Sequence, residues 1–266
     1  MKGFSRRNVY YMVLFAREYP ELEFVQQLVA QIPWGHNTLL LDKLKDRESR
    51  VWYVKKTIEN GWSRSVLLHW VDGGLHKRQG KALANFKNTL TSPHSDLARE
   101  TLKDPYNFDF LTLREEFDEK ELEDGLINHI QKFLLELGAG FAFVGRQINL
   151  CVGDQDFFID LLFYHVKLRC FIVVELKATE FKPEHAGKMN FYLTAVDRTM
   201  KHPDDKPTIG LLLCKTKNKV VAEYALQDIN KPLGVAEYET KIIESLPDDL
   251  KGSLPTIEEI EHEFEE

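Results

Sequence analysis

The sequence predicts an α/β protein in which a mostly helical N-terminal module precedes a mixed sheet covered by helices. Apolar residues recur at three- and four-residue spacing through most of the first half, whereas short apolar runs without alternation, such as residues 170–174, follow in the second. The 266 residues allow one large or two modest domains. A hydrophobic share of 43% with only 3 Cys excludes collagen-like, disordered and disulfide-stapled classes.

The first half reads as a series of short helices. Ser5 is a favourable cap for a helix over residues 5–19, which ends before Pro20. Further helices are expected over residues 22–32, 37–43, 47–60 and 63–71, separated by glycines. Their succession resembles a winged-helix or helix-turn-helix arrangement. Residues 104–118 lose the pattern, so we predict a linker there, a boundary near residue 115 and a helical domain over residues 1–115.

The second half changes character and predicts a domain over residues 116–240. A helix is expected over residues 119–137, because apolar residues repeat on one face until Gly138. The elements expected after it are strands over 141–152, 156–165 and 169–177, a helix from Pro183 to before Pro203, a strand over 208–214, a helix over 218–226 and a strand over 234–238. The order is α-β-β-β-α-β, then α-β, with a hairpin at residues 153–155.

The negative charge of the chain is concentrated at its end. Nine acidic residues and two lysines between residues 240 and 266 account for the whole net charge of −7. Residues 1–118 carry a net charge of +3, and residues 119–239 carry −3. Charge therefore neither excludes nor demands a nucleic-acid partner. Residues 241–266 are expected to form a solvated acidic tail.

No stretch of the sequence predicts a membrane segment. No run approaches the roughly 18 apolar residues of a membrane helix, and residues 1–7 lack the apolar core of a signal peptide. The cysteines Cys151, Cys170 and Cys214 lie far apart without a C-x-x-C pair, so neither zinc nor disulfides are indicated. We expect a cytoplasmic protein whose cysteines are small buried side chains.

Two of the predicted buried strands contain charges. Asp160 has three apolar residues on either side, and an isolated ion in such surroundings costs several kcal/mol unless it is paired, coordinated or protonated. Glu175 and Lys177 project from one face of the next strand, about 6.6 Å apart, because strand side chains alternate. A hairpin between the two strands can bring Asp160 beside Glu175.

Two carboxylates this close require a cation, and oxygen ligands favour Mg²⁺ or Mn²⁺ over zinc. Such an ion can activate water and polarise a phosphodiester. Lys177 would orient and help deprotonate the attacking water, or neutralise charge on the phosphate. Spacing alone leaves a second interpretation open, in which Asp160 and Lys177 form a bridge at a sheet edge without any metal.

An acid followed about fifteen residues later by Glu-x-Lys, between two helices, resembles the PD-(D/E)XK nuclease fold. The blocks that resemble, more narrowly, the YhcG-like family of bacterial PD-(D/E)XK proteins are GFAFVGRQ, DFFIDLLFYHVKLRCFIVVELK, FKPEHAGKMNFYLTAVD and IGLLLCKTKNKVVAEYAL, within about residues 120–240. A family-typical N-terminal module resembles GFSRRNVYYMVLFAREYP, IPWGHNTLLL and ENGWSRSVL. The resemblance implies a restriction-endonuclease-like core and a metal-dependent nuclease.

The resemblance also implies residue roles. Asp160 and Glu175 would bind the metal, with the Leu176 carbonyl as a further ligand, and Lys177 would be the catalytic lysine. Glu123 matches the helix acid that often joins such sites. A separate correspondence concerns the pair Lys188 and Tyr192, which stand where RecB-type nucleases carry Gln-x-x-x-Tyr. Lysine in place of glutamine suggests a phosphate contact, and the proline of the family name is missing before Asp160.

The N-terminal half contains candidate DNA contacts. Arg6 and Arg7 begin a predicted helix, where backbone amides also favour phosphate, and Arg64 begins another. The substrate expected is DNA, with RNA as an alternative, and two paired sites in a homodimer would suit cutting of both strands. A protein of another class remains open: a catalytically weak DNA-binding or scaffolding protein with the same carboxylate site.

Overall fold

The computed structural model describes residues 4–21, 28–114 and 116–242, which fall into two compact units. The first unit contains residues 1–82 and 99–104, and the second contains residues 83–98 and 105–266. The boundaries expected at residues 115 and 240 stay predictions, while the compact units divide earlier in the chain. None of the helices in the described ranges combines the length and apolar character of a membrane span.

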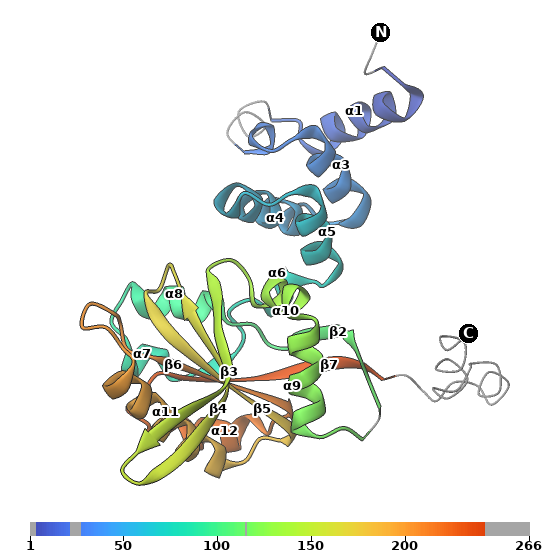
Figure 1. Cartoon of the computed structure of the whole chain (residues 1–266). Helices are drawn as coiled ribbons and strands as arrows, with labels where there is room; N and C mark the ends of the chain where they lie inside the picture. The colour runs from blue at the N-terminus through green and yellow to red at the C-terminus, as the bar shows by residue number, and fades with distance from the viewer. Residues whose placement is uncertain (1–3, 22–27, 115, 243–266) are drawn as a thin grey trace, which may run out of the picture. The chain divides into compact units, whose positions relative to one another are not determined.

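The first unit is helical, as predicted. Its helices are α1 (Arg6–Glu18), α3 (Trp34–Lys43), α4 (Arg47–Asn60), α5 (Arg64–Asp72) and α6 (Leu75–Arg78), with a 3-10 turn at Val29–Gln31 (Figure 1). The side chains of Ser5, Asp46 and Ser63 accept backbone hydrogen bonds at the starts of α1, α4 and α5. Part of the helix expected over residues 22–32 lies outside the described residues. Within the described part of this unit, the β pairing is one isolated bridge between Gln79 and Lys103.

The second unit is built on a mixed seven-stranded sheet in the order β1-β7-β6-β5-β4-β3, with β2 beside β7. The strands are β1 (Leu83–Ala84), β2 (Tyr106–Leu113), β3 (Phe141–Val152), β4 (Gln155–His165), β5 (Cys170–Glu180), β6 (Ile209–Thr216) and β7 (Leu233–Ile242). Strands β3, β4 and β5 are antiparallel neighbours, whereas β5, β6 and β7 run parallel. This arrangement confirms the predicted αβββαβ core with a mixed sheet.

Helices cover both faces of this sheet, as Figure 1 shows. They are α9 (Glu119–Asn128), α10 (Ile130–Leu137), α11 (Pro183–Thr199) and α12 (Lys219–Gln227), with the short α7 (Phe86–Thr89) and α8 (His94–Thr101) between β1 and β2. On one face, Phe133 of α10 packs edge-on against Phe163 of β4. On the other, Met189 and Leu193 of α11 join a core with Val173 of β5. Coverage on both faces explains the uninterrupted apolar runs.

Three expectations were wrong in detail. The single helix expected over residues 119–137 is two helices, because His129 leaves helical geometry at φ −114° and ψ 33°. The expected linker over residues 104–118 contains β2, which pairs in parallel with β7. Tyr106 and Phe108 of this segment are buried positions of the strand. Finally, Cys151 is exposed, although Cys170 and Cys214 are buried as expected.

Candidate active site

The predicted site lies where two neighbouring strands separate. β4 and β5 pair from His165 and Cys170 up to Leu161 and Val174, and the pairing ends there. The next residues on the two strands are Asp160 and Glu175. Beyond this point β4 continues with β3, and β5 continues with β6. The sheet therefore opens into a fork that has one acid on each branch.

Side chains replace the missing ladder bonds at the fork. The backbone N–H of Leu176 donates to Asp160 Oδ2 at 2.9 Å, and the backbone N–H of Asp160 lies 3.4 Å from Glu175 Oε1. Glu175 is only 1% exposed, and Asp160 is half-buried. The two acids that the sequence predicted to meet are thus brought together, and each is fixed by the other's strand.

The electrostatics of the fork disfavour two negative charges. Burial, and then repulsion from Asp160, raises the pKa of Glu175 from its ordinary 4.5 to about 7. Burial also raises the pKa of Asp160, although the Leu176 N–H and two nearby lysines oppose the shift. Perturbed acids of this kind concentrate at functional sites.

Lys177 lies at the same strand end and is 7% exposed. Its Nζ donates to the Leu176 carbonyl at 2.8 Å and to Glu119 Oε2, also at 2.8 Å. The hydroxyl of Tyr238 donates to the Lys177 carbonyl at 3.0 Å. The ammonium is therefore held by Glu119, the first residue of α9, and forms no ion pair with Asp160. The metal-free Asp160–Lys177 bridge that the sequence left open is not present.

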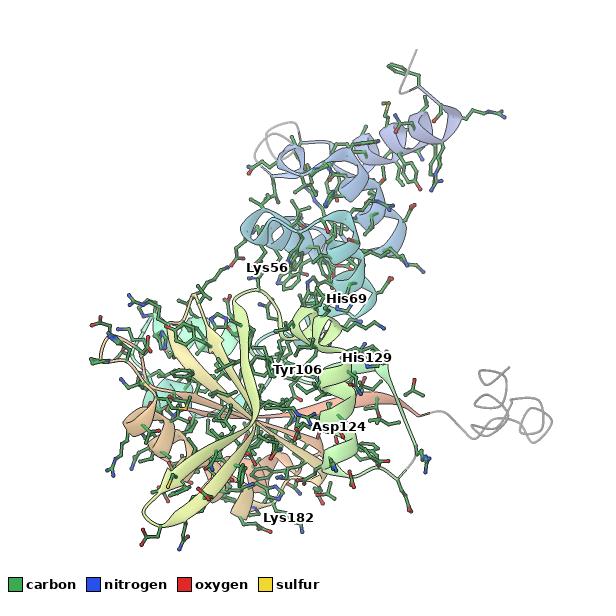
Figure 2. All side chains as sticks on the ribbon, in the orientation of Figure 1. Lys56, His69, Tyr106, Asp124, His129 and Lys182 are labelled. Carbon is green, nitrogen blue, oxygen red and sulfur yellow. The ribbon has the colours of Figure 1, made fainter. Side chains whose placement is uncertain are left out.

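Helix α9 presents a second acid to the site. Glu123 lies one turn after Glu119, is 6% exposed, and accepts a hydrogen bond from Gln147 of β3. Burial raises its pKa, the Gln147 bond opposes that shift, and the charge of Asp160 reinforces it. The next residue on α9 is Asp124, which Figure 2 labels. Asp124 forms an ion pair with Arg146 of β3 at 2.8 Å.

Helix α11 contributes the pair of residues four positions apart. Lys188 Nζ lies 3.0 Å from Glu175 Oε2 and 5.0 Å from the ring centroid of Tyr192. Burial alone would lower the pKa of Lys188, but the charge of Glu175 raises it overall. Tyr192 is 3% exposed and packs in the hydrophobic core, so its side chain is not a surface contact for a substrate. Lys188 thus supplies a cation to the buried acid of the fork.

The imidazole of His185 is influenced by the charge of Lys177. His185, near the start of α11, accepts a hydrogen bond at Nδ1 from the backbone N–H of Lys182, which Figure 2 labels. Burial, and then the charge of Lys177, lowers the pKa of His185. The sequence reasoning missed Glu119, although its four-residue spacing to Glu123 could have revealed it. It also missed Gln147, whose backbone conformation no sequence pattern indicates.

The donor set at the fork fits Mg²⁺ or Mn²⁺. Asp160 and Glu175 are hard oxygen donors, one on each branch, whereas the Leu176 carbonyl, the further ligand that the resemblance implies, accepts a hydrogen bond from the Lys177 ammonium at 2.8 Å. A divalent cation would relieve the repulsion that, after burial, raises the pKa of Glu175. Among the described residues, no group of three or more His, Cys, Asp or Glu side chains is placed to hold a metal. Magnesium commonly binds through one or two carboxylates and keeps several waters, which suits this set.

The basic residues predicted to contact DNA lie in the first unit, at the starts of α1 and α5. Both helix starts are hydrogen-bonded to the start of α3. Trp34, which begins α3, donates from Nε1 to Asn8 of α1 at 2.6 Å. Arg64, which begins α5, donates from Nε to the carbonyl of Gly35 at 3.3 Å. The exposed Arg6 and Arg7 begin α1. The N-terminal ends of α1, α3 and α5 are therefore linked, and N-terminal amides attract phosphate.

The comparisons with known proteins match both parts of the chain. Residues 99–255 match the model of the YhcG PDDEXK nuclease domain, and residues 1–78 match that of the DUF1016 N-terminal domain. The protein YhcG of Escherichia coli (strain K12) is 35% identical over 251 residues, which cover 91% of this chain. This chain spans 66% of the length of that relative.

Solved structures give partial matches. A repair endonuclease from Pyrococcus abyssi is 12% identical, with a TM-score of 0.32, over 49% of this chain and 50% of that chain. A complex of EndoMS with double-stranded DNA is 14% identical, with a TM-score of 0.34, over 52% of this chain and 50% of that chain.

Proposed function

We propose that this protein, which belongs to the YhcG PDDEXK nuclease domain family, is a metal-dependent nuclease that hydrolyses phosphodiester bonds in DNA. The observation that carries the proposal is the fork between β4 and β5, where Asp160 and Glu175 face each other beside Lys177. Neither acid gains from this proximity in the folded chain alone, since burial and mutual repulsion raise the pKa of Glu175. The ion pair of Glu175 with Lys188 leaves this repulsion in place, and a divalent ion that binds both acids and a phosphate would offset it.

The reaction replaces one phosphorus–oxygen bond by another. An attacking water forms the new bond to phosphorus and loses a proton, while the bond to the leaving sugar oxygen breaks and that oxygen gains a proton. When bound at Asp160 and Glu175, the ion would polarise the phosphate and lower the pKa of the water. The ammonium of Lys177, fixed at 2.8 Å by the Leu176 carbonyl, would hold the attacking water or the charged phosphate oxygen in place.

The first unit supports a nucleic-acid substrate. Arg6, Arg7 and Arg64 are exposed at the linked starts of α1 and α5, so their charges add to the positive ends of the helix dipoles. Phosphate contacts of this kind hold a polynucleotide without reading its sequence. We propose that this unit holds the DNA that the second unit cuts. A homodimer and a cytoplasmic location stay predictions from the sequence.

The proposal is tested by replacing Lys177 with Met and by measuring cleavage and binding separately. Matched DNA and RNA substrates are offered with Mg²⁺ to the full chain, and DNA affinity is measured in Ca²⁺. We expect Mg²⁺-dependent DNA cleavage by the wild type, a fall in kcat of about 10²–10³-fold in Lys177→Met, and DNA affinity within a few-fold of wild type. Lys120→Met removes the same charge from an exposed position on α9 and should leave cleavage unchanged.

Two results would contradict the proposal. Binding of DNA with no cleavage above background in either protein would identify a DNA-binding protein without nuclease activity. Cleavage of RNA but not of DNA, lost in Lys177→Met, would keep the chemistry and change the substrate.

A further inference from the structure

Gln147 has an unusual backbone in the middle of a strand. Its φ is 48°, in the left-handed region, where a side chain with a Cβ is disfavoured. The register with β4 shifts between Phe143 and Gly145 but is continuous across Gln147, since Arg146 opposes Leu161 and Ile148 opposes Ile159. Gln147 itself has no registered partner, and the residue that the register would place opposite it is Asp160. The distortion of β3 therefore coincides with the fork residue of β4.

Among the described residues, Arg169 is the other non-glycine residue with positive φ, at 52°. Arg169 lies in the turn between β4 and β5, where such a conformation is common, and its N–H donates to the His165 carbonyl at 2.7 Å. Gln147 lies inside a strand, where a turn does not require positive φ. Strained residues in such places persist when their surroundings hold them, and they cluster at functional sites.

The contact that uses this conformation is with Glu123. Gln147 Nε2 donates to Glu123 Oε2, and Arg146 Nε lies 3.9 Å from Glu123 Oε1. Two successive residues of β3, one of them the distorted residue itself, therefore approach different oxygens of one buried carboxylate. An ordinary strand sends successive side chains to opposite faces, so it would not place both beside the same group.

We infer that Gln147 is a positioning residue of the nuclease site, whose carboxamide orients the Glu123 carboxylate so that Glu123 assists in holding the divalent ion through a bound water. The inference rests on the proposed function. It deepens that function by adding a strand residue that touches neither the phosphate nor the ion. Partners of this kind that orient metal ligands commonly change metal affinity or activity by about 10–100-fold when removed.

The test separates strain from positioning by comparing Gln147→Gly, Gln147→Ala and Arg169→Gly in the full chain. The measurements are Tm, Mn²⁺ affinity by calorimetry, and kcat and KM for Mg²⁺-dependent DNA cleavage. Gln147→Gly and Gln147→Ala should both weaken Mn²⁺ binding about 10-fold and lower kcat by about 10–100-fold, with KM for DNA unchanged. Only Gln147→Ala keeps the disfavoured backbone, so its Tm should lie below that of Gln147→Gly by about 2–4 °C.

Arg169→Gly is the matched control, because it relieves the same backbone conformation away from the site. Its Tm should rise by about 2 °C while Mn²⁺ affinity and kcat stay at wild-type values. Wild-type Mn²⁺ affinity in both Gln147 variants would overturn the inference, because the Gln147–Glu123 bond would then only tie β3 to α9. If the wild type binds Mn²⁺ but cuts nothing, the proposed function fails, and the Mn²⁺ affinities still decide the role of Gln147.

Discussion

The two units of the molecule differ in how their buried charges are arranged. In the first unit, Arg50 pairs with Glu18, Arg78 donates from Nε to the Gly73 carbonyl at 2.8 Å, and Lys103 Nζ lies 5.2 Å from the ring centroid of Trp70. Each of these cations has a partner that stabilises its charge. In the second unit, Lys177 pairs with Glu119 and Lys188 pairs with Glu175. Two acids nevertheless also face each other across the fork, and burial and repulsion raise the pKa of Glu175.

Under the proposed function, the difference separates charges that serve folding from charges that serve chemistry. A paired buried cation lowers the energy of the folded chain, or at least offsets the cost of its own burial. Adjacent buried acids raise that energy, so their presence indicates a ligand that binds the folded protein. We therefore expect substitutions at the fork to affect activity more than stability, and substitutions in the first unit to do the reverse.

The largest effect that we expect is on the stability of the metal-free protein, whose free energy of unfolding should depend on pH through Glu175. It tests whether the fork of the second unit is destabilised by its own charges. Because the folded pKa of Glu175 is about 7 and its ordinary value is 4.5, the folded state binds the proton more tightly than the unfolded state. This stabilising contribution is complete below about pH 4.5 and is lost as pH rises to about 7. Its loss lowers the free energy of unfolding by about 2–3 kcal/mol. Denaturant unfolding in EDTA measures it.

Asp160 and Glu123 shift in the same direction, so the informative quantity is the difference between wild type and Glu175→Gln. That variant cannot ionise at this position and should show a flatter profile between pH 4.5 and 7. If the free energy of unfolding varied with pH in the same way in both proteins, Glu175 would not destabilise the folded chain when it ionises. The contrast between the units would then be weaker.

A smaller effect is expected from Glu119, which holds Lys177 at 2.8 Å. Glu119→Gln should lower kcat about 10-fold at unchanged KM, because the ammonium loses the carboxylate that orients it. Steady-state cleavage with Mg²⁺ measures this. Glu121→Gln is the control, since Glu121 accepts from the backbone of Asp118 in the capping box of α9 and makes no contact with Lys177. An equal fall in kcat in both variants would mean that kcat depends on the integrity of the first turn of α9 and not on the Glu119–Lys177 ion pair.

The smallest effect belongs to the first unit. The buried Tyr53 hydroxyl donates to the Trp70 carbonyl at 2.9 Å. Tyr53→Phe should lower the free energy of unfolding by about 1–2 kcal/mol, because that carbonyl loses its donor, while kcat stays at the wild-type value. Tyr10→Phe, at a position 62% exposed, should change neither quantity. A loss of kcat in folded Tyr53→Phe would break the division of roles between the units.

Much of the second unit could be predicted because its pattern is local. Strand β3 has the bounds expected from its residues, and Pro183 begins α11 as predicted. β2 was missed because this segment forms a strand only by pairing with β7, which is more than a hundred residues away in the chain. The break between α9 and α10 was also missed, since the apolar repeat continues past His129.

The sequence by itself determined the chemistry of the site: two acids and a lysine in apolar strands, where unpaired charge is costly and requires a partner. Only the tertiary structure decided which charges meet. Asp160 faces Glu175 because the β4–β5 ladder ends beside them, and Lys177 pairs with Glu119 rather than with Asp160. The positive φ of Gln147 likewise belongs to the folded chain, since contacts between distant elements hold it and no local preference favours it.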